Sequence, residues 1–187
     1  MLSKILPFIN SYNDQYIKLL HINKDFIKNL SKLVKELIKI KKNKKKLLIF
    51  GNGGSAAIAS HFSLDITNVN GITCQNFNDS SLITCFSNDF GYENWVSRAI
   101  KYYYRTGDLV ILISSKGESK NMINAAKFIK KYKTSKLVTF TGFNNKNNLK
   151  KNGNINFWVN SKKYNQIENI HQYWLLLIVD TIAQLKK

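Results

Sequence analysis

The sequence is poor in arginine, although it is strongly basic. Only Arg98 and Arg105 stand among its 29 basic residues, and its formal net charge at pH 7 is +18. Arginine is the usual residue for pairing with phosphates and for recognising base edges. The excess of lysine, which accompanies abundant asparagine and isoleucine, therefore indicates a trend in composition rather than a designed patch. We do not expect nucleic acid as a partner.

Cysteines are few, and long apolar runs are missing. The two cysteines, Cys74 and Cys85, lie in apolar segments, which favours reduced thiols over a disulfide. No apolar run reaches the roughly 18–20 residues that cross a bilayer. The stretch 1–13 mixes polar and apolar residues and has no small-residue cleavage site. These observations predict a cytoplasmic protein without a membrane partner.

The spacing of apolar residues predicts a single α/β domain. A chain of 187 residues can bury a core of ordinary size. Residues 5–40 carry apolar side chains at helical spacing, with a break near 21–23. We therefore expect one domain over 1–187, made of an N-terminal helical segment over 1–44 and an α/β core over 45–187.

Strand-like and helix-like segments alternate along the expected core. The expected strands are 46–50, 71–77, 109–114, 136–141 and 155–159. The expected helices are 55–67, 80–87, 92–104, 119–132 and 167–185, and the polar segment 144–154 is expected to be a mobile surface loop. This alternation implies right-handed crossovers and a three-layer α/β sandwich around a five-stranded parallel sheet.

A glycine-rich turn follows the first expected strand. Residues 47–50 are apolar, and residues 51–57 read Gly-Asn-Gly-Gly-Ser-Ala-Ala. The glycines allow close backbone approach, and we expect Ser55 to cap a helix whose N-terminal N–H groups can hold an anion or a sugar oxygen. Ala56 stands where a dinucleotide-binding G-x-G-x-x-G motif would have its third glycine, so that motif is incomplete.

A second loop of similar design reads Ser-Ser-Lys-Gly-Glu-Ser over residues 114–119, after an apolar strand and before a helix. Ser114, Ser115 and Ser119 offer hydroxyls beside helix-start N–H groups, which suits a dianionic phosphate. Lys116 either adds a cation there or is a solvated loop residue. Because ligands of open α/β sheets bind outside the C-terminal strand ends, we expect both loops to hold a phosphorylated small molecule.

These motifs resemble the sugar-isomerase (SIS) domain family and, within it, the phosphoheptose isomerases that act on sedoheptulose 7-phosphate. The resemblance rests on residues 51–57 and 59–62, on Asn-Asp-Phe-Gly-Tyr-Glu at 88–93, and on the serine-rich stretch 114–121. It extends over nearly the whole chain. It implies a flavodoxin-like fold and an aldose–ketose isomerase that makes D-glycero-D-manno-heptose 7-phosphate, or a related sugar phosphate, for lipopolysaccharide or capsule.

The resemblance also implies which residues contact the substrate. They are Asn52, Gly53, Gly54, Ser55, Asn88, Asp89, Ser114, Ser115, Lys116, Ser119 and Asn165. Asp89 would either bind two adjacent sugar hydroxyls or serve only as a turn residue. Asn165 stands where the family has an aspartate, which removes a charge from the predicted site.

Moving a proton between neighbouring carbons requires a base and a group that stabilises the enediolate oxygen. His61 and Asp65 are four residues apart on one expected helix and so share a face. We expect His61, Asp65 and Glu168 to be the catalytic residues, with Asp65 or Glu168 as the base. His171 matches a family histidine and is either an acid–base group or a structural residue.

The resemblance further implies a zinc ion on His61, Asp65 and Glu168. Asp65 is one methylene shorter than the family's glutamate, Glu168 replaces the usual glutamine, and Leu176 replaces a ligand histidine. Three side chains and a water can still complete a catalytic zinc site. Both a zinc-bound and a metal-free site therefore stay open.

Leu176 and Asn165 leave a second function open, a non-catalytic phosphosugar-binding module that acts as a sensor or a subunit partner. The segment 170–185 is apolar nearly all round, which predicts burial against a neighbouring subunit. We expect a homo-oligomer, specifically a tetramer with twofold interfaces, in which Glu168 and His171 lie near a neighbour's loop.

Overall fold

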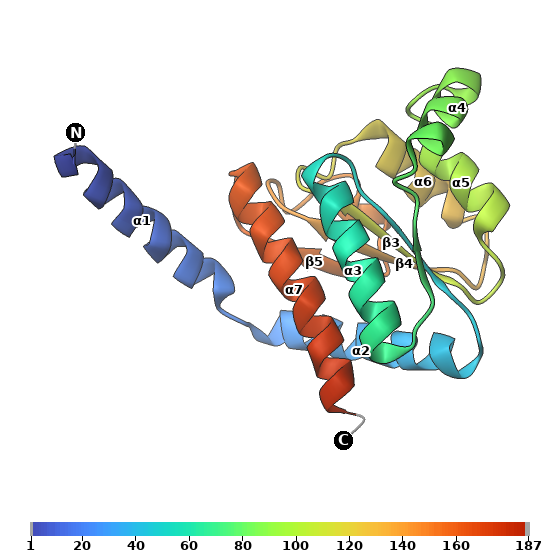
Figure 1. Cartoon of the computed structure of the whole chain (residues 1–187), viewed down its shortest axis with the longest axis horizontal. Helices are drawn as coiled ribbons and strands as arrows, with labels where there is room; N and C mark the ends of the chain where they lie inside the picture. Colours follow the sequence, from blue (N-terminus) through green and yellow to red (C-terminus); the bar gives the residue numbers. More distant parts are fainter. Residues whose placement is uncertain (1, 186–187) are drawn as a thin grey trace.

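Five strands form the sheet at the centre of the computed structural model, which describes residues 2–185 (Figure 1). Residues 1 and 186–187 of the predicted domain lie outside the described part. The strands are β1 (Leu47–Phe50), β2 (Cys74–Asn76), β3 (Leu109–Ser114), β4 (Lys136–Thr141) and β5 (Ile155–Trp158). They lie in the order β2-β1-β3-β4-β5, and every neighbouring pair is parallel. The predicted five-stranded parallel sheet is confirmed.

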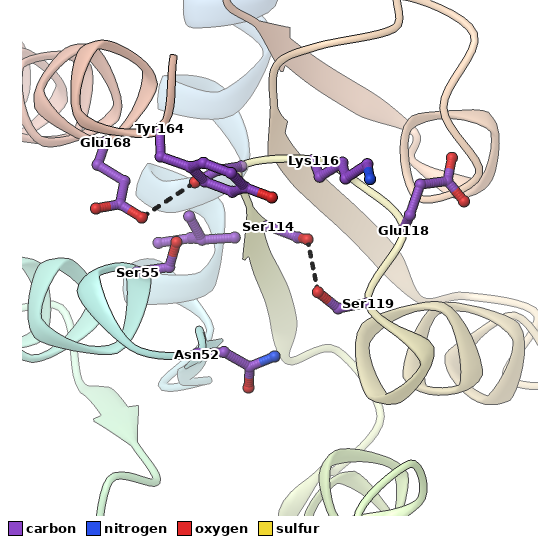
Figure 2. Close-up of a pocket in the computed structure, with 10 residues that line it drawn as sticks. Asn52, Ser55, Ser114, Lys116, Glu118, Ser119, Tyr164 and Glu168 are labelled. Atoms are coloured by element: carbon purple, nitrogen blue, oxygen red, sulfur yellow. Dashed lines mark hydrogen bonds between the residues drawn. The ribbon is translucent and has the colours of Figure 1, made fainter. Parts of the chain in front are cut away.

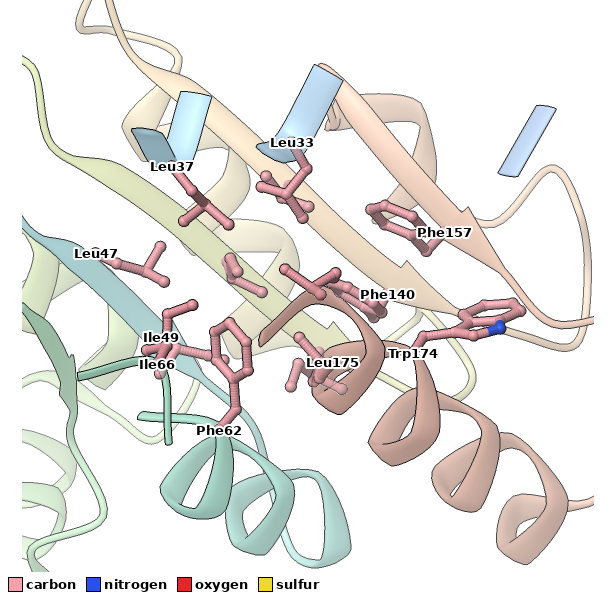
Figure 3. Close-up of a cluster of buried hydrophobic side chains, with 14 of the residues drawn as sticks. Leu33, Leu37, Leu47, Ile49, Phe62, Ile66, Phe140, Phe157, Trp174 and Leu175 are labelled. Atoms are coloured by element: carbon pink, nitrogen blue, oxygen red, sulfur yellow. The ribbon is translucent and has the colours of Figure 1, made fainter. Parts of the chain in front are cut away.

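Helices cover both faces of the sheet. One face carries α2 (Lys24–Lys42), α3 (Gly54–Asn70) and α7 (Tyr164–Gln184), and the other carries α4 (Ser80–Phe90), α5 (Trp95–Tyr103) and α6 (Lys120–Ile129). The core under α2, α3 and α7 includes Leu47 and Phe140 (Figure 3). Along β3, Ile111 and Ile113 belong to this core, whereas Val110 and Leu112 belong to the core on the other face of the sheet. Alternate side chains thus enter opposite layers, which explains why this strand reads as a continuous apolar run.

The N-terminal helix α1 (Leu2–Leu20) extends away from the rest of the molecule (Figure 1), and none of its described side chains is buried. The break between α1 and α2 lies at residues 21–23, as the sequence predicts. Asn23 caps α2, because its Oδ1 accepts a hydrogen bond from the Phe26 N–H at 2.8 Å. Of α1 and α2, only α2 packs on the sheet. Between residues 2 and 185, no helix is long and apolar enough to cross a bilayer.

The strand order reverses between β1 and β3. The chain leaves β1 through α3 toward β2, and it leaves β3 through α6 toward β4 on the opposite face. A crevice opens at such a reversal, beyond the C-terminal ends of the two strands. The glycine loop (residues 51–54) and the serine loop (residues 114–119) both begin at this crevice.

The predicted boundaries differ from the observed ones by a few residues. Helix α7 begins at Tyr164 instead of residue 167, and β2 covers only Cys74–Asn76 instead of 71–77. Strand β2 lies at the sheet edge and has a single partner, β1, with which it pairs over three residues. Its length is therefore set by that pairing, which the apolar pattern does not reveal.

Candidate active site

A cavity of about 350 Å³ lies between the glycine loop, the serine loop and the first turns of α7 (Figure 2). The predicted site residues that line it are Asn52, Ser55, Ser114, Ser115, Lys116, Ser119 and Glu168. Ile113, Glu118 and Tyr164 complete the lining. The sequence therefore predicts most of the walls of the cavity, and polar groups from three distant segments meet there.

The serine loop brings hydroxyl groups together at the start of α6. The hydroxyls of Ser114 and Ser119 are hydrogen-bonded at 3.2 Å (Figure 2), and Ser119 is the N-cap residue of the helix. The Gly117 N–H donates to the Ser114 hydroxyl at 3.2 Å, and Gly117 has a positive φ of 71°. Hydroxyls and a helix N-terminus that converge on one cavity form a suitable site for a phosphate.

The segment expected to be a mobile surface loop supports the serine loop. Asn147 and Leu149 are almost fully buried, so the prediction is wrong at these two positions. The Leu149 N–H donates to the Gly117 carbonyl oxygen at 2.9 Å, and the Asn148 side chain donates to the Glu118 carboxylate at 2.7 Å. A polar segment is buried here because its asparagines satisfy backbone and carboxylate groups.

The glycine loop turns into α3 without a side-chain cap. Gly53 is the N-cap residue, with φ 53° and ψ −123°, so the prediction that Ser55 caps the helix is wrong. A positive φ favours glycine at this turn. Ser55 is the second residue of α3 and is buried against the cavity. At Gly54 a Cβ atom would lie 2.3 Å from Glu168 Oε2, so the absence of a side chain there makes room for the carboxylate.

Asn52 is fixed by two neighbours. Its Nδ2 donates to Asn121 Oδ1 at 3.1 Å, and Asn121 Nδ2 donates back to Asn52 Oδ1 at 2.9 Å. The Tyr92 hydroxyl also donates to Asn52 Oδ1, at 3.2 Å. The motif stretch 114–121 contains Asn121, but no role of Asn121 or Tyr92 could be predicted from the sequence. Both residues set the orientation of the Asn52 amide at the cavity.

Glu168 is the carboxylate that contacts the serine loop at the cavity. Ser115 Oγ donates to Glu168 Oε1 at 3.3 Å (Figure 2). The N-terminus of α3 also lies beside the carboxylate, through the contact with Gly54, and a helix N-terminus favours negative charge. Tyr164, one turn earlier on α7, is half exposed and also lines the cavity; nothing in the sequence marked it.

His61 and Asp65 form a pair on α3, as their spacing predicts, but outside this cavity. His61 Nε2 lies 3.2 Å from Asp65 Oδ2, and His61 Nδ1 lies 2.8 Å from Gln172 Nε2. An amide nitrogen only donates, so Nδ1 accepts and Nε2 carries the proton toward Asp65. Gln172, one turn after Glu168, is the α7 residue that contacts His61.

The predicted set of His61, Asp65 and Glu168 is therefore not assembled within one chain. Among residues 2–185, no three His, Cys, Asp or Glu side chains are grouped to hold a metal ion. The reason is geometric: the helical turn between Glu168 and Gln172 directs the carboxylate to the serine loop and the amide to His61. The residues of a single chain do not fit a zinc site.

Five predicted substrate residues do not line the cavity: Gly53, Gly54, Asn88, Asp89 and Asn165. Asn88 and Asp89 are exposed at the end of α4, where Asn88 Nδ2 donates to Asp89 Oδ1 at 3.1 Å. Asn165 is exposed at the start of α7, and its carbonyl oxygen accepts from the Tyr16 hydroxyl at 3.3 Å. The cavity lining of one chain therefore does not include Asn88, Asp89 or Asn165: α4 ends outside it, and in the first turns of α7 Tyr164 and Glu168 line the cavity while Asn165 does not.

His171 is a structural residue. It is fully buried, and its Nε2 lies 3.2 Å from the Thr141 carbonyl oxygen. Burial lowers the pKa of His171 to about 4, and the hydrogen bond to Thr141 partly opposes this shift. The ring packs edge-on against Phe140, with 5.7 Å between centroids. Of the two roles left open by the sequence, this geometry favours the structural one, and a place beside a neighbour's loop stays a prediction.

Comparison with protein families agrees with this geometry. Residues 11–142 match the family described as the SIS domain. The chain is 34% identical over 171 residues to a phosphoheptose isomerase of Buchnera aphidicola, a match that covers 87% of this chain and 88% of the relative. A phosphoheptose isomerase of Campylobacter concisus is 33% identical over 153 residues, covering 76% of this chain and 78% of the relative.

Solved structures show the same fold. A phosphoheptose isomerase from Francisella tularensis superposes with a TM-score of 0.84 at 22% identity, covering 98% of both chains. Phosphoheptose isomerase GmhA from Neisseria gonorrhoeae gives a TM-score of 0.81 at 23% identity, covering 97% of this chain and 98% of the other. The flavodoxin-like arrangement expected from the sequence is therefore correct along almost the entire chain.

Proposed function

This chain belongs to the SIS domain family and, within it, to the phosphoheptose isomerases, and we propose that it interconverts sedoheptulose 7-phosphate and D-glycero-D-manno-heptose 7-phosphate. One observation carries the proposal at the level of the site. The Glu168 carboxylate lies beside a hydroxyl-rich serine loop in a cavity of sugar-phosphate size. A base and a phosphate site in one cavity are what an aldose–ketose isomerase of this kind requires.

The phosphate binds at the serine loop. The hydroxyls of Ser114 and Ser119 are hydrogen-bonded to each other at 3.2 Å, so they lie at a common place. Lys116 is exposed at the cavity wall and supplies a positive charge. The N-terminus of α6, where Ser119 is the N-cap residue, adds its dipole to the same place.

The hydroxyl groups of the sugar chain extend from the serine loop toward the glycine loop. Asn52 and Ser55 line that wall of the cavity. The Asn52 amide is fixed by Asn121 and Tyr92, so it contacts the sugar without first losing conformational freedom.

Glu168 carries the proton. It takes a proton from C1 of the ketose, the electron pair forms a C1–C2 double bond, and the carbonyl oxygen on C2 becomes the enediolate oxygen. Return of the proton to C2, with transfer of the C1 hydroxyl proton to the C2 oxygen, gives the aldose. The Ser115 hydroxyl donates to Oε1 at 3.3 Å and so holds the carboxylate in position for the transfer.

Zinc stays a prediction of the family resemblance. Since His61 and Asp65 do not meet Glu168 within one chain, we assign no step of the reaction to a metal ion. Metal content of the purified protein, measured by plasma mass spectrometry before and after chelation, tests the prediction directly.

We further propose that the chain forms a homo-oligomer, in particular a tetramer with twofold interfaces. Helix α1 supports this, because Leu6 and Phe8 are each exposed by more than 60% and Ile17 by 67%. Exposed apolar side chains on one helix need a protein partner to leave water. We also propose a cytoplasmic location, which suits the free thiols Cys74 and Cys85, and a role in supplying heptose for lipopolysaccharide or capsule.

A coupled assay for heptose 7-phosphate formation, with and without added zinc, tests the activity. We expect the purified protein to turn over the substrate. We expect the double variant that combines Ser119→Ala with Glu168→Gln to lose this activity. If the protein binds sedoheptulose 7-phosphate but shows no turnover under either condition, the isomerase proposal fails.

The second candidate function, a non-catalytic phosphosugar-binding module, rests on Leu176, which replaces a family histidine. Its test is Leu176→His. A large gain in rate and metal content would indicate a decayed site, whereas an already active protein that gains nothing supports catalysis by Glu168.

A further inference from the structure

A second and larger cavity, of about 610 Å³, lies at the opposite edge of the sheet from β2, beside strand β5. It is bounded by the junction of α1 and α2, by the segment 145–150 and by the start of the chain beyond β5. Within the described chain it shares no lining residue with the candidate active site. The proposed isomerase reaction makes no use of it.

The walls of this second cavity are strongly cationic. Lys18, Lys28, Lys32 and Lys150 line it, and Asp25 is the one carboxylate among the lining residues. None of these lysines belongs to a salt bridge in the part of the chain that the structure describes. Unpaired cations around a concave surface create a positive potential that attracts anions.

Lys150 is held in place at this cavity. Its Nζ lies 5.2 Å from the centre of the Trp158 ring, and it donates to Asn145 Oδ1. Burial lowers the pKa of Lys150 from its ordinary value, and the nearby Asp25 carboxylate opposes this shift. A partly desolvated ammonium group gains more from a bound anion than an exposed one does.

Two tryptophan side chains add hydrogen-bond donors without acceptors. The indole N–H groups of Trp158 and Trp174 are buried and have no hydrogen-bond partner among the described residues. Trp174 is 6% exposed and packs against Phe26, with 5.0 Å between ring centroids. In Figure 3 its nitrogen lies on the side of the ring away from Leu175. Buried donors without acceptors are uncommon in folded proteins and favour a ligand that carries an acceptor.

We propose that this cavity binds a small aromatic phosphate, of which a nucleotide is the simplest example. The lysines would hold the phosphate groups, and Trp158, which is half-buried, would contact the ring. The volume lies within the range of about 300–1,000 Å³ that ligand pockets occupy.

Intrinsic tryptophan fluorescence measures the binding, since two of the three tryptophans line the cavity and Trp95 lies in the other core. The purified, assembled protein is titrated with ADP, with inorganic phosphate and with adenosine. We expect ADP to change the fluorescence with a Kd below about 1 mM, and the two fragments to bind at least about tenfold more weakly. Equal affinity for phosphate and ADP would overturn the aromatic part of the proposal, and no response to any probe would overturn all of it.

Variants locate the site. Lys150→Met should weaken ADP binding about tenfold, and Trp158→Phe should weaken it while Phe keeps the apolar wall. Lys127→Met, a change on α6 far along the opposite face, is the matched control and should bind like the wild type. Thermal unfolding measurements show whether each variant is folded. If Lys150→Met does not fold, Lys32→Met takes its place in the binding experiment.

Competition separates this cavity from the candidate active site. Saturating sedoheptulose 7-phosphate should leave ADP binding unchanged. Displacement of ADP by the sugar phosphate would show that ADP occupies the serine loop, and the proposal would fail. Because the readout is binding, the result does not depend on whether the protein is an active isomerase.

Discussion

Asn52 and Asn121 hold each other through two opposed hydrogen bonds, at 2.9 and 3.1 Å, between the glycine loop and the first turn of α6. The Asn52 oxygen also accepts from Tyr92, so both of its hydrogen-bonding directions are used. One N–H of the Asn52 amide goes to Asn121, and the other has no partner among residues 2–185. Asn52 therefore presents a donor to the cavity and recognises an oxygen that accepts, such as a sugar hydroxyl or the carbonyl.

Replacing Asn121 should disturb catalysis although it does not line the cavity. Asn121→Ala removes both bonds to Asn52 and leaves the amide free to turn, and we expect kcat/KM to fall by about 10- to 100-fold. Tyr92→Phe is the matched control, because Asn52 keeps its bonds to Asn121, and we expect a loss of at most about tenfold. Steady-state kinetics of both variants decide the matter. Similar losses of kcat/KM in the two variants would show that the bonds from Asn121 orient Asn52 no more strongly than the bond from Tyr92 does.

Changing the carboxylates tests which one is the base. Glu168→Gln keeps the side-chain volume and should lower kcat by about 10²- to 10⁴-fold with little change in sugar-phosphate binding, because the proton acceptor is lost. Asp65→Asn alters a carboxylate that is paired with His61 outside the cavity, and it should retain most of the activity. The reverse outcome would assign the base to Asp65.

A methyl group at Gly54 should displace the Glu168 carboxylate. The Cβ of Gly54→Ala would meet Oε2 at 2.3 Å, and the carboxylate must move away from the cavity. We expect kcat to fall by about 10- to 100-fold, as misplacement of a catalytic group does, while the protein stays folded. Ala57→Ser, at an exposed position on the same helix, should have wild-type kinetics. Unchanged kcat in Gly54→Ala would argue against Glu168 as the base.

The buried His171 should make the protein sensitive to mild acid. Its pKa is about 4 in the folded state and about 6.5 in the unfolded chain, so between these values the unfolded chain binds a proton that the folded one does not. The free energy of unfolding should therefore fall as the pH drops from about 6.5 to about 4, by about 3 kcal/mol from this group. Urea titrations across this range measure the loss.

His171→Gln keeps a donor for the Thr141 carbonyl and removes the titration, so its stability should depend less on pH in that window. His21→Gln, a change at an exposed histidine, should keep the wild-type dependence. A pH dependence that is the same in His171→Gln and in the wild type would show that other groups are responsible.

The parts of the site that follow one another in the chain could be predicted from the sequence. The serine loop carries its hydroxyls within six residues after a strand, so their position at the sheet edge follows from the parallel fold. Contacts between distant elements could not be predicted in this way. Whether Glu168 or Gln172 faces His61 depends on the rotation of α7 against α3, and no local pattern sets that rotation.

The buried asparagines show the same limit. A stretch as polar as 144–154 indicates a solvent-exposed loop, yet Asn147 is buried because its side chain serves neighbouring backbone groups. The hydrogen-bond partners that make its burial favourable are visible only in three dimensions.

The candidate active site joins Asn52, near the first strand, to Glu168, on the last helix. The ribosome synthesises the chain from its N-terminus, so Asn52 emerges long before Glu168 and the second wall of the cavity forms late. A sugar phosphate therefore has no complete site on a nascent chain. By binding, the sugar phosphate raises the stability only of chains that contain both walls of the cavity. Truncated copies that lack Glu168 gain no such stability from the substrate.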